Sequence, residues 1–159
     1  MTELKFRNAA IEDVPDLIKL FKETIVEVYG QILPRDRLMP WIEGDRLRSD
    51  VNLLWQKMIV AEKEGEIVAV AAALEDKVAL LWVHPDHQRN GIGGALLDIV
   101  EAELARSGHE TAKLECFSDN DRALGFYRAR GWNVLCQEMD EYAGALKMVM
   151  TKTLKKDVS

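Results

Sequence analysis

Residues 78–94, VALLWVHPDHQRNGIGG, contain the signals that decide the fold. The first six residues are apolar throughout, which is typical of a central strand covered on both faces. A polar loop over residues 84–90 follows, and the glycines after it lead into a run with apolar residues at helical spacing. These apolar residues are Ile92, Leu96, Ile99, Val100 and Leu104. A strand, a loop and a helix in this order predict a crossover to a parallel strand.

The chain before this stretch predicts a long helix and a less regular segment. Asp13 is a typical N-cap, and Gly30 is predicted to end the helix that begins after Asp13. The apolar residues of this helix are Val14, Leu17, Ile18, Phe21, Ile25 and Val28. Residues 33–55 have mixed periodicity, and we expect a loop with one or two short helices there.

The remaining chain predicts further strands and one more helix. The strands, read from apolar or alternating runs, lie at 4–7, 58–63, 67–74, 112–117, 132–139 and 145–154. Residues 120–130 predict a helix that Gly131 ends. The elements indicate a mixed α/β class built around one sheet, with residues 1–159 as a single domain.

Composition excludes several classes of protein. Hydrophobic residues make up 48% and charged residues 30% of the 159 residues, so a disordered or fibrous chain does not fit. The 21 Lys and Arg residues against 27 Asp and Glu residues give a net charge of -6. Because the sequence contains no basic block, we expect no nucleic-acid partner.

We expect a cytoplasmic protein that does not contact a membrane. The first ten residues lack a hydrophobic segment, and no apolar run approaches the roughly 20 residues that cross a bilayer. In a reducing compartment Cys116 and Cys136 would remain thiols and behave as small core residues. The His and Cys residues have no compact metal-binding spacing, so no metal is expected.

The glycine loop at residues 88–94 is suited to bind a phosphate. Glycines allow close backbone approach, and the free N–H groups of a first helical turn attract an anion. A P-loop is excluded because no Lys and no Ser or Thr follow Gly93. A dinucleotide fingerprint fits poorly, since Leu96 stands where a third Gly or Ala is needed. A tight turn without any ligand remains an alternative.

Two signatures in this sequence resemble the GCN5-related N-acetyltransferase (GNAT) superfamily. In the first, Gln88, Gly91 and Gly93 occupy the positions of its acyl-coenzyme A loop. In the second, LECFSDNDRALGFYRARGW at residues 114–132, five positions are in register: Asn120, Ala123, Phe126, Tyr127 and Gly131. The likeness is sharp from about residue 78 to residue 132.

This resemblance implies a GNAT-like fold and activity. The fold would have a mixed, mostly antiparallel central sheet of about seven strands, flanked by about four helices. The activity would be direct transfer of an acetyl group from acetyl-CoA, as co-substrate, to a primary amine. The implied cofactor-binding residues are Leu81, Trp82, Val83, Gln88, Arg89, Asn90, Gly91, Ile92, Gly93, Gly94 and Asn120.

The resemblance also implies roles in catalysis. Tyr127 would be the general acid that protonates the leaving thiolate, because a phenol with a pKa of ~10 is close to matched with a thiol of pKa ~8.5. A backbone N–H near Val83 would polarise the thioester carbonyl. Glu115 is the preferred base, since acetyltransferases of protein N-termini have a glutamate at the corresponding place. His84 or His87 are alternatives.

The acceptor is not encoded in a motif. The resemblance leaves small amines and protein N-termini open, and it implies a homodimer. The acceptor wall would form from residues 29–55 and around Tyr142. Two other functions stay open: a non-catalytic acyl-CoA sensor, and a structural interaction domain without a cofactor.

Overall fold

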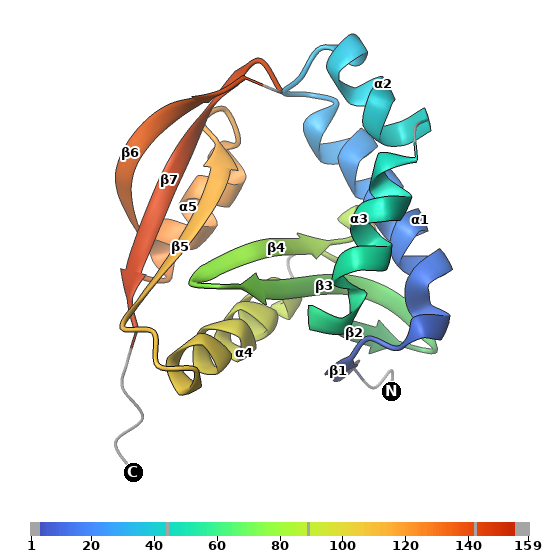
Figure 1. Ribbon diagram of the computed structural model, residues 1–159, viewed down its shortest axis with the longest axis horizontal. Helices are drawn as coiled ribbons and strands as arrows, with labels where there is room; N and C mark the ends of the chain where they lie inside the picture. The colour runs from blue at the N-terminus through green and yellow to red at the C-terminus, as the bar shows by residue number, and fades with distance from the viewer. Residues whose placement is uncertain (1–3, 44, 89, 142, 155–159) are drawn as a thin grey trace.

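The computed structural model describes residues 4–43, 45–88, 90–141 and 143–154. In this part of the chain, seven strands form one sheet with the order β1-β2-β3-β4-β5-β7-β6 (Figure 1). The strands are β1 (Leu4–Asn8), β2 (Met58–Lys63), β3 (Glu66–Leu74), β4 (Lys77–Val83), β5 (Thr111–Phe117), β6 (Asn133–Asp140) and β7 (Ala145–Thr153). Only β4 and β5 are parallel neighbours. The mixed, mostly antiparallel sheet predicted from the sequence is confirmed.

Five α-helices accompany the sheet in the described residues. They are α1 (Val14–Thr24), α2 (Arg35–Glu43), α3 (Arg46–Leu54), α4 (Ile92–Arg106) and α5 (Asp121–Ala129). The irregular segment at residues 33–55 forms both of the short helices that its periodicity allowed.

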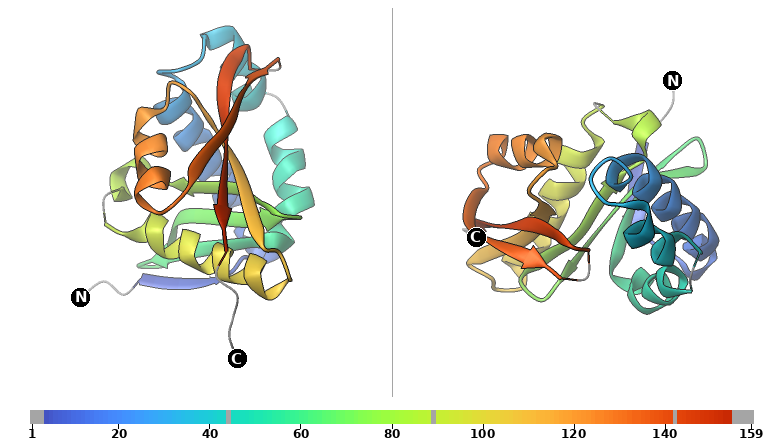
Figure 2. Two further views of the ribbon diagram at one scale, coloured as in Figure 1. Left: turned by 90° about the vertical axis from the view of Figure 1, so that its left-hand side faces the viewer. Right: turned by 90° about the horizontal axis from the view of Figure 1, so that it is seen from above.

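The helices cover both faces of the sheet. Figure 2 shows α1, α2 and α3 on one side, and α4 and α5 on the other. Each side has its own apolar core, because neighbouring residues of a strand point to opposite faces. On β2, for example, Val60 packs under α1 and α3, whereas Ala61 packs under α4. The α4 residues that the sequence placed at helical spacing lie in this second core.

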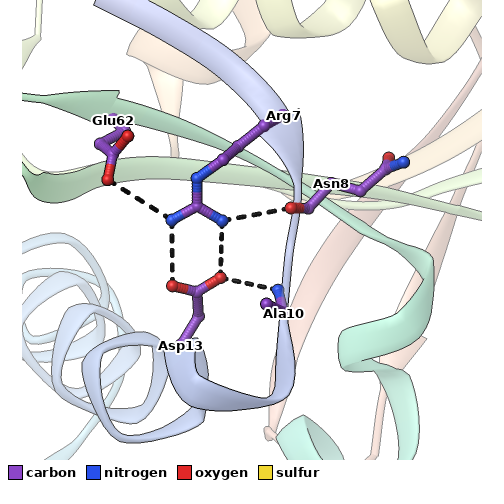
Figure 3. A network of polar contacts seen from close by, with 5 residues as sticks. All are labelled: Arg7, Asn8, Ala10, Asp13 and Glu62. Carbon is purple, nitrogen blue, oxygen red and sulfur yellow. Dashed lines mark hydrogen bonds and ion pairs between the residues drawn. The ribbon is translucent and has the colours of Figure 1, made fainter.

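Asp13 does not cap α1 through its side chain, contrary to the prediction. Its carboxylate oxygens instead accept hydrogen bonds from the Arg7 guanidinium at 2.7 and 3.0 Å, and from the Ala10 backbone N–H at 2.7 Å (Figure 3). A two-point bond to a guanidinium is stronger than a single bond to a helix N–H. The hydrogen bonds from Arg7 lower the pKa of Asp13. The Arg7 guanidinium also pairs with the Glu62 carboxylate at 3.5 Å. The network joins β1, β2 and the start of α1.

Gly30 ends the first helical segment for a different reason from the one expected. After Thr24 the backbone widens into a π-helical turn, Ile25–Tyr29, and Gly30 follows with a φ of -61°, in the right-handed region. A Cβ at Gly30 would collide with the carbonyl oxygen of Val26. The glycine is therefore needed for close approach to this turn and not for a left-handed conformation.

The two cysteines differ in their surroundings. Cys116 lies on β5, is partly buried and packs against the core below α4 and α5. Cys136 lies on the outer strand β6 and is exposed. The expectation that both behave as core residues is therefore wrong for Cys136, because β6 is covered on neither face along most of its length.

Candidate active site

Strands β4 and β5, both described throughout, pair only near their N-terminal ends. The single register pair is Lys77 with Lys113, and the Lys113 N–H donates to the Asp76 carbonyl at 3.0 Å. Beyond this point the strands diverge. In Figure 1, β4 lies nearly horizontal, whereas β5 rises steeply from lower left to upper right. The sequence predicted the parallel neighbour of β4.

A β-bulge at Ala79 explains where the divergence begins. On β3, Ala73 pairs with Val78 and Ala72 pairs with Leu80, so Ala79 has no partner there. The extra residue changes the face of the residues after it: Val78 packs toward α4, but Leu80 packs toward α1. Bulges bend a strand and occur often next to active sites. Here the bulge turns β4 away from β5.

The end of β4 directs backbone groups into this opening. The His84 N–H donates to the Val68 carbonyl of β3 at 2.8 Å. Because backbone groups alternate in direction along a strand, the N–H of Val83 points away from β3, toward the side of β5. The Val83 carbonyl accepts a hydrogen bond from the Gln88 side chain at 3.3 Å. This geometry supports the expected use of a backbone N–H near Val83.

The glycine loop leads into the N-terminus of α4. Gly91 is the N-cap, with a φ of 79°, and no side chain caps the helix. Its first-turn N–H groups are therefore available to an anion. Asn90 is exposed. The side chain of Ile92 is buried in the core, so Ile92 can offer a ligand only its backbone N–H. Arg89 lies outside the described residues.

Arg130 is a residue of this site that the sequence reasoning missed. A Cβ at Gly94 would overlap its guanidinium, so Arg130 lies directly against the first turn of α4. The guanidinium stacks 4.9 Å from the centre of the Phe126 ring, one helical turn earlier on α5. Among the residues that the structure describes, no carboxylate forms an ion pair with it. Two features of the sequence could have indicated this contact: the i, i+4 spacing of Phe126 and Arg130, and the Gly93-Gly94 pair, which leaves space for a side chain.

Tyr127 lies on α5, in the apolar core on the side of the sheet that α4 and α5 cover. It is 8% exposed, and its ring contacts Phe126 and Trp132 at centroid distances of 5.2 and 6.2 Å. Burial raises the pKa of Tyr127 above its ordinary value, with a smaller contribution from Cys116. Burial likewise raises the pKa of the Cys116 thiol to about 11. A phenol and a thiol in this location are therefore both weaker acids than in water.

Asn120 caps α5. Its side-chain oxygen accepts a hydrogen bond from the Ala123 N–H at 3.2 Å, as an N-cap residue does. The carboxamide oxygen is thus engaged within the protein. This leaves the carboxamide NH₂ as the group that Asn120 can offer to a ligand.

Glu115 reaches the opening from the opposite face. Cys116 packs toward Tyr127 and α5, so Glu115, one residue earlier on β5, points to the face covered by α1. Its carboxylate pairs with Lys147 at 3.1 Å and with Lys77 at 3.8 Å, and its side chain is 39% exposed. To take a proton, Glu115 would have to give up one of these contacts.

Of the two loop histidines, His84 is poorly suited to act as a base. The Nδ1 of His84 accepts a hydrogen bond from the Asp86 N–H at 3.1 Å, and its Nε2 lies 2.6 Å from a Glu23 carboxylate oxygen. Both ring nitrogens of His84 are therefore occupied. His87 lies next to it, with the ring centroids 5.9 Å apart. Of the three candidate bases, Glu115 is the one that lies on a strand bordering the opening.

Tyr29, at the end of the π-helical turn, is the first residue of the range 29–55 that the sequence analysis placed in the acceptor wall. Its ring lies edge to face with Trp82 on β4 and with Phe117 on β5, at centroid distances of 6.1 and 5.4 Å. Burial raises the pKa of Tyr29 to about 12, against a hydrogen bond from Trp82 that lowers it. Tyr142, also expected in the acceptor wall, lies outside the described residues.

The described ranges contain no cluster of three or more His, Cys, Asp or Glu side chains arranged to hold a metal ion. None of their helices has the length and apolar character needed to cross a bilayer.

The chain is similar to several solved acetyltransferase structures. The PaiA N-acetyltransferase of Thermoplasma acidophilum, in complex with coenzyme A, has 18% identity and a TM-score of 0.79 over 95% of this chain and 99% of its own. The ribosomal-protein-S18-alanine N-acetyltransferase of Escherichia coli has 18% identity and a TM-score of 0.71 over 96% and 95%. YncA of Salmonella typhimurium, with its cofactor acetyl-CoA, has 18% identity and a TM-score of 0.69 over 99% and 97%. At these identities the likeness shows the fold.

The family follows from a separate comparison. Residues 17–132 match the profile of the acetyltransferase (GNAT) family, and this range includes β4, the glycine loop, α4, β5 and α5. It contains the opening between β4 and β5 together with both sequence signatures. The chain therefore belongs to the GNAT acetyltransferase family.

Proposed function

We propose that the chain of residues 1–159 acts as one N-acetyltransferase domain that transfers an acetyl group from acetyl-CoA directly to a primary amine. The observation that carries this proposal is the opening between β4 and β5, with the bare N-terminus of α4 at its edge and Tyr127 below it. A thioester substrate supplies an activated acetyl group, and the chain supplies its position and the proton transfers.

The residues around the opening fit acetyl-CoA. The N–H groups of Leu81 and Val83 point toward β5, where no ladder uses them, and suit the amides of a pantetheine arm. The first turn of α4 suits a diphosphate. Arg130 adds a positive charge at that turn, which an acidic protein needs in order to bind a polyanion.

Tyr127 is the proposed general acid. During transfer the amine nitrogen bonds to the carbonyl carbon, the carbon–sulfur bond breaks, and Tyr127 gives its proton to the leaving sulfur. Burial raises the pKa of Tyr127, which alone would weaken it as an acid. The neighbouring Cys116, with a thiol pKa of about 11, indicates that a thiol here is weakened as well. Acid and leaving group therefore stay close to matched.

Glu115 is the proposed base. It faces the side of the sheet opposite to Tyr127, so an amine approaching from the face of α1 and α2 would meet Glu115 first. The amine proton would pass to the Glu115 carboxylate, directly or through a water. Proton removal and proton donation would then occur on opposite faces of the opening, which prevents the two groups from exchanging a proton with each other.

The acceptor would reach the site beside α2. A hollow of about 370 Å³ lies between α2 and the end of β6, lined by Asp36, Arg37, Pro40 and Glu141. Its wall contains two carboxylates and one guanidinium, and this net negative charge favours a cationic amine. We propose a small amine or a protein N-terminus as the acceptor. The E. coli relative named above acts on an alanine of ribosomal protein S18, which supports the second class by analogy.

Two further expectations remain predictions. The free thiols of Cys116 and Cys136, the latter exposed, suit a reducing compartment, and we propose that the protein acts in the cytoplasm. A homodimer would be expected to form at the outer strand β6, where Val134, Leu135 and Met139 are exposed.

The proposed function is tested by binding and by turnover. Acetyl-CoA at a hundred times its Kd should stabilise the fold by about 2.7 kcal/mol, read as a rise in Tm. Free thiol release with a panel of amines should identify the acceptor. Tyr127→Phe should bind acetyl-CoA normally and lower kcat by about 10²-fold to 10⁴-fold. Arg122→Gln, on the exposed face of the same helix, is the control.

The outcomes separate the rival functions. Absence of any stabilisation by acetyl-CoA would exclude the acetyltransferase and favour a structural interaction domain. Stabilisation without thiol release on any amine, in wild type and Tyr127→Phe alike, would favour a non-catalytic acyl-CoA sensor.

A further inference from the structure

Tyr29 borders the opening between β4 and β5 on the side of α1. The backbones of the two strands part after Lys77 and Lys113, and the aromatic side chains near their far ends are Trp82 and Phe117. The Tyr29 ring stands between these two, edge to face with each. Trp82 is supported from behind by Phe21 of α1, with ring centroids 4.6 Å apart. A row of four aromatic rings thus bridges the strands where hydrogen bonds do not.

The backbone of α1 is built to place this ring. The π-helical turn contains one more residue per turn than an α-helix would, and Tyr29 is its last residue. Gly30 permits this turn, because any side chain there would strike the Val26 carbonyl. π-helical turns are rare and occur mostly at functional sites. The position of Tyr29 is therefore fixed by an uncommon local structure.

Tyr29 is also close to the groups that would surround the reacting thioester. The Tyr29 ring contacts Trp82, the residue before Val83, whose N–H is proposed to polarise the thioester carbonyl. In the proposed function Tyr127 protonates the leaving sulfur, and the acyl carbon is bonded to that sulfur. An acyl group held at the Val83 N–H would therefore lie between β4 and β5, where the Tyr29 ring contacts Trp82 and Phe117.

We propose, on the basis of the proposed function, that Tyr29 sets the length of the acyl group: the ring leaves room for acetyl and excludes butyryl and longer chains. The wall it forms is rigid, because Tyr29 is held by Trp82 and Phe117 and by the backbone turn. Such a wall discriminates sterically and not through its hydroxyl group. Removal of the ring, and not of the hydroxyl, should change the preference.

The test compares Tyr29→Ala with Tyr29→Phe. The Kd values of acetyl-CoA, butyryl-CoA and free CoA are measured by isothermal titration calorimetry, which requires no acceptor. In the wild type, butyryl-CoA should bind at least about tenfold more weakly than acetyl-CoA, since butyryl has two additional methylenes and a single extra methylene in a pocket is discriminated about 10-fold to 200-fold. Tyr29→Ala should bring the two Kd values together, and Tyr29→Phe should keep the wild-type ratio. Free CoA should bind all three proteins equally.

Each other outcome is decisive. An unchanged ratio in Tyr29→Ala, equal binding of both thioesters by the wild type, or a loss of preference in Tyr29→Phe would overturn the role of the ring. If the wild type bound neither thioester nor CoA, the proposed function itself would fail. Melting curves establish that each variant is folded, and Tyr29→Val replaces Tyr29→Ala if the alanine variant does not fold.

Discussion

β4 meets its two neighbours in opposite ways. Toward β3 it is paired from Lys77 to Val83, with a single bulge, whereas toward β5 it is paired only at Lys77. On the closed side, backbone groups satisfy one another and the strands up to β1 form a continuous ladder. On the open side, backbone donors remain for a ligand and side chains fill the space. Stability is thus expected to depend on the closed junctions, and ligand binding and chemistry on the open one.

Among the variants that test this comparison, Glu115→Gln at the open junction is expected to have the largest effect. If Glu115 is the base, kcat should fall by about 10²-fold, equivalent to roughly 2.7 kcal/mol. The free energy of unfolding should change by less than about 1 kcal/mol, because the ion pairs of Glu115 are exposed. Kinetics with the identified acceptor and a denaturant titration measure both quantities.

Lys147→Met is the matched control for Glu115. It removes the ion-pair partner at 3.1 Å and leaves the carboxylate in place. A loss of kcat as large as that of Glu115→Gln would mean that the pair, and not the carboxylate, supports the reaction.

On the closed side of β4, Asp13→Asn should weaken the attachment of β1 to β2 and α1. This change removes the charge from the network that joins β1, β2 and α1, and we expect a loss of about 2 kcal/mol of stability with little change in acetyl-CoA binding. Because Arg7 lowers the pKa of Asp13 below its ordinary 3.8, the stabilisation is fully present above that pH and is lost as the pH falls through the lower native value.

Urea titrations at several pH values measure this difference. The gap between wild type and Asp13→Asn should be constant at neutral pH and shrink below about pH 4. A gap that does not depend on pH would show that the stabilisation comes from packing and not from the charge of Asp13.

The smallest effect is expected from Gly94→Ala, which sharpens the account of the open junction. The new Cβ would displace the Arg130 guanidinium from the first turn of α4, and KM for acetyl-CoA should rise about fivefold. Arg130→Gln should have the same effect, and the double variant should add nothing further. Additive effects in the double variant would contradict a shared role.

Gly125→Ala is the control for a glycine-to-alanine change in a helix. Apart from its chain neighbours and the backbone of its own helix, a Cβ at Gly125 would have no atom within 4 Å, so the methyl group meets only open space on α5. We expect the variant to be more stable by about 0.5–1 kcal/mol, with KM unchanged.

The sequence predicted the order and type of the main elements, because periodicity and glycine positions report local structure. It did not predict the bulge at Ala79, since six consecutive apolar residues contain no alternation from which a change of face could be recognised. It also misassigned Asp13, because the competing partner Arg7 becomes a neighbour only after β1 and α1 pack together.

The candidate site was predictable only in part. The glycine loop and Tyr127 belong to two short signatures and were found from them. Arg130 was missed, and Tyr29 was expected only as part of the acceptor wall at residues 29–55. Both make contacts that are distant in sequence: Arg130 against Gly94, and Tyr29 between Trp82 and Phe117. Such pairs depend on how elements cross in space, which a single sequence does not encode in any local pattern.

The bulge at Ala79 has a consequence for how the length of this protein can vary. One residue more or fewer between Lys77 and Val83 would turn each side chain from Leu80 to Val83 to the opposite face of the sheet. Each of these side chains would then point into the other apolar core. The turn before β4, where Glu75 already adopts a positive φ of 58°, is under no such constraint. Insertions engineered into this domain should therefore be accepted at that turn and rejected four residues later in the chain, although both sites lie in the same hairpin.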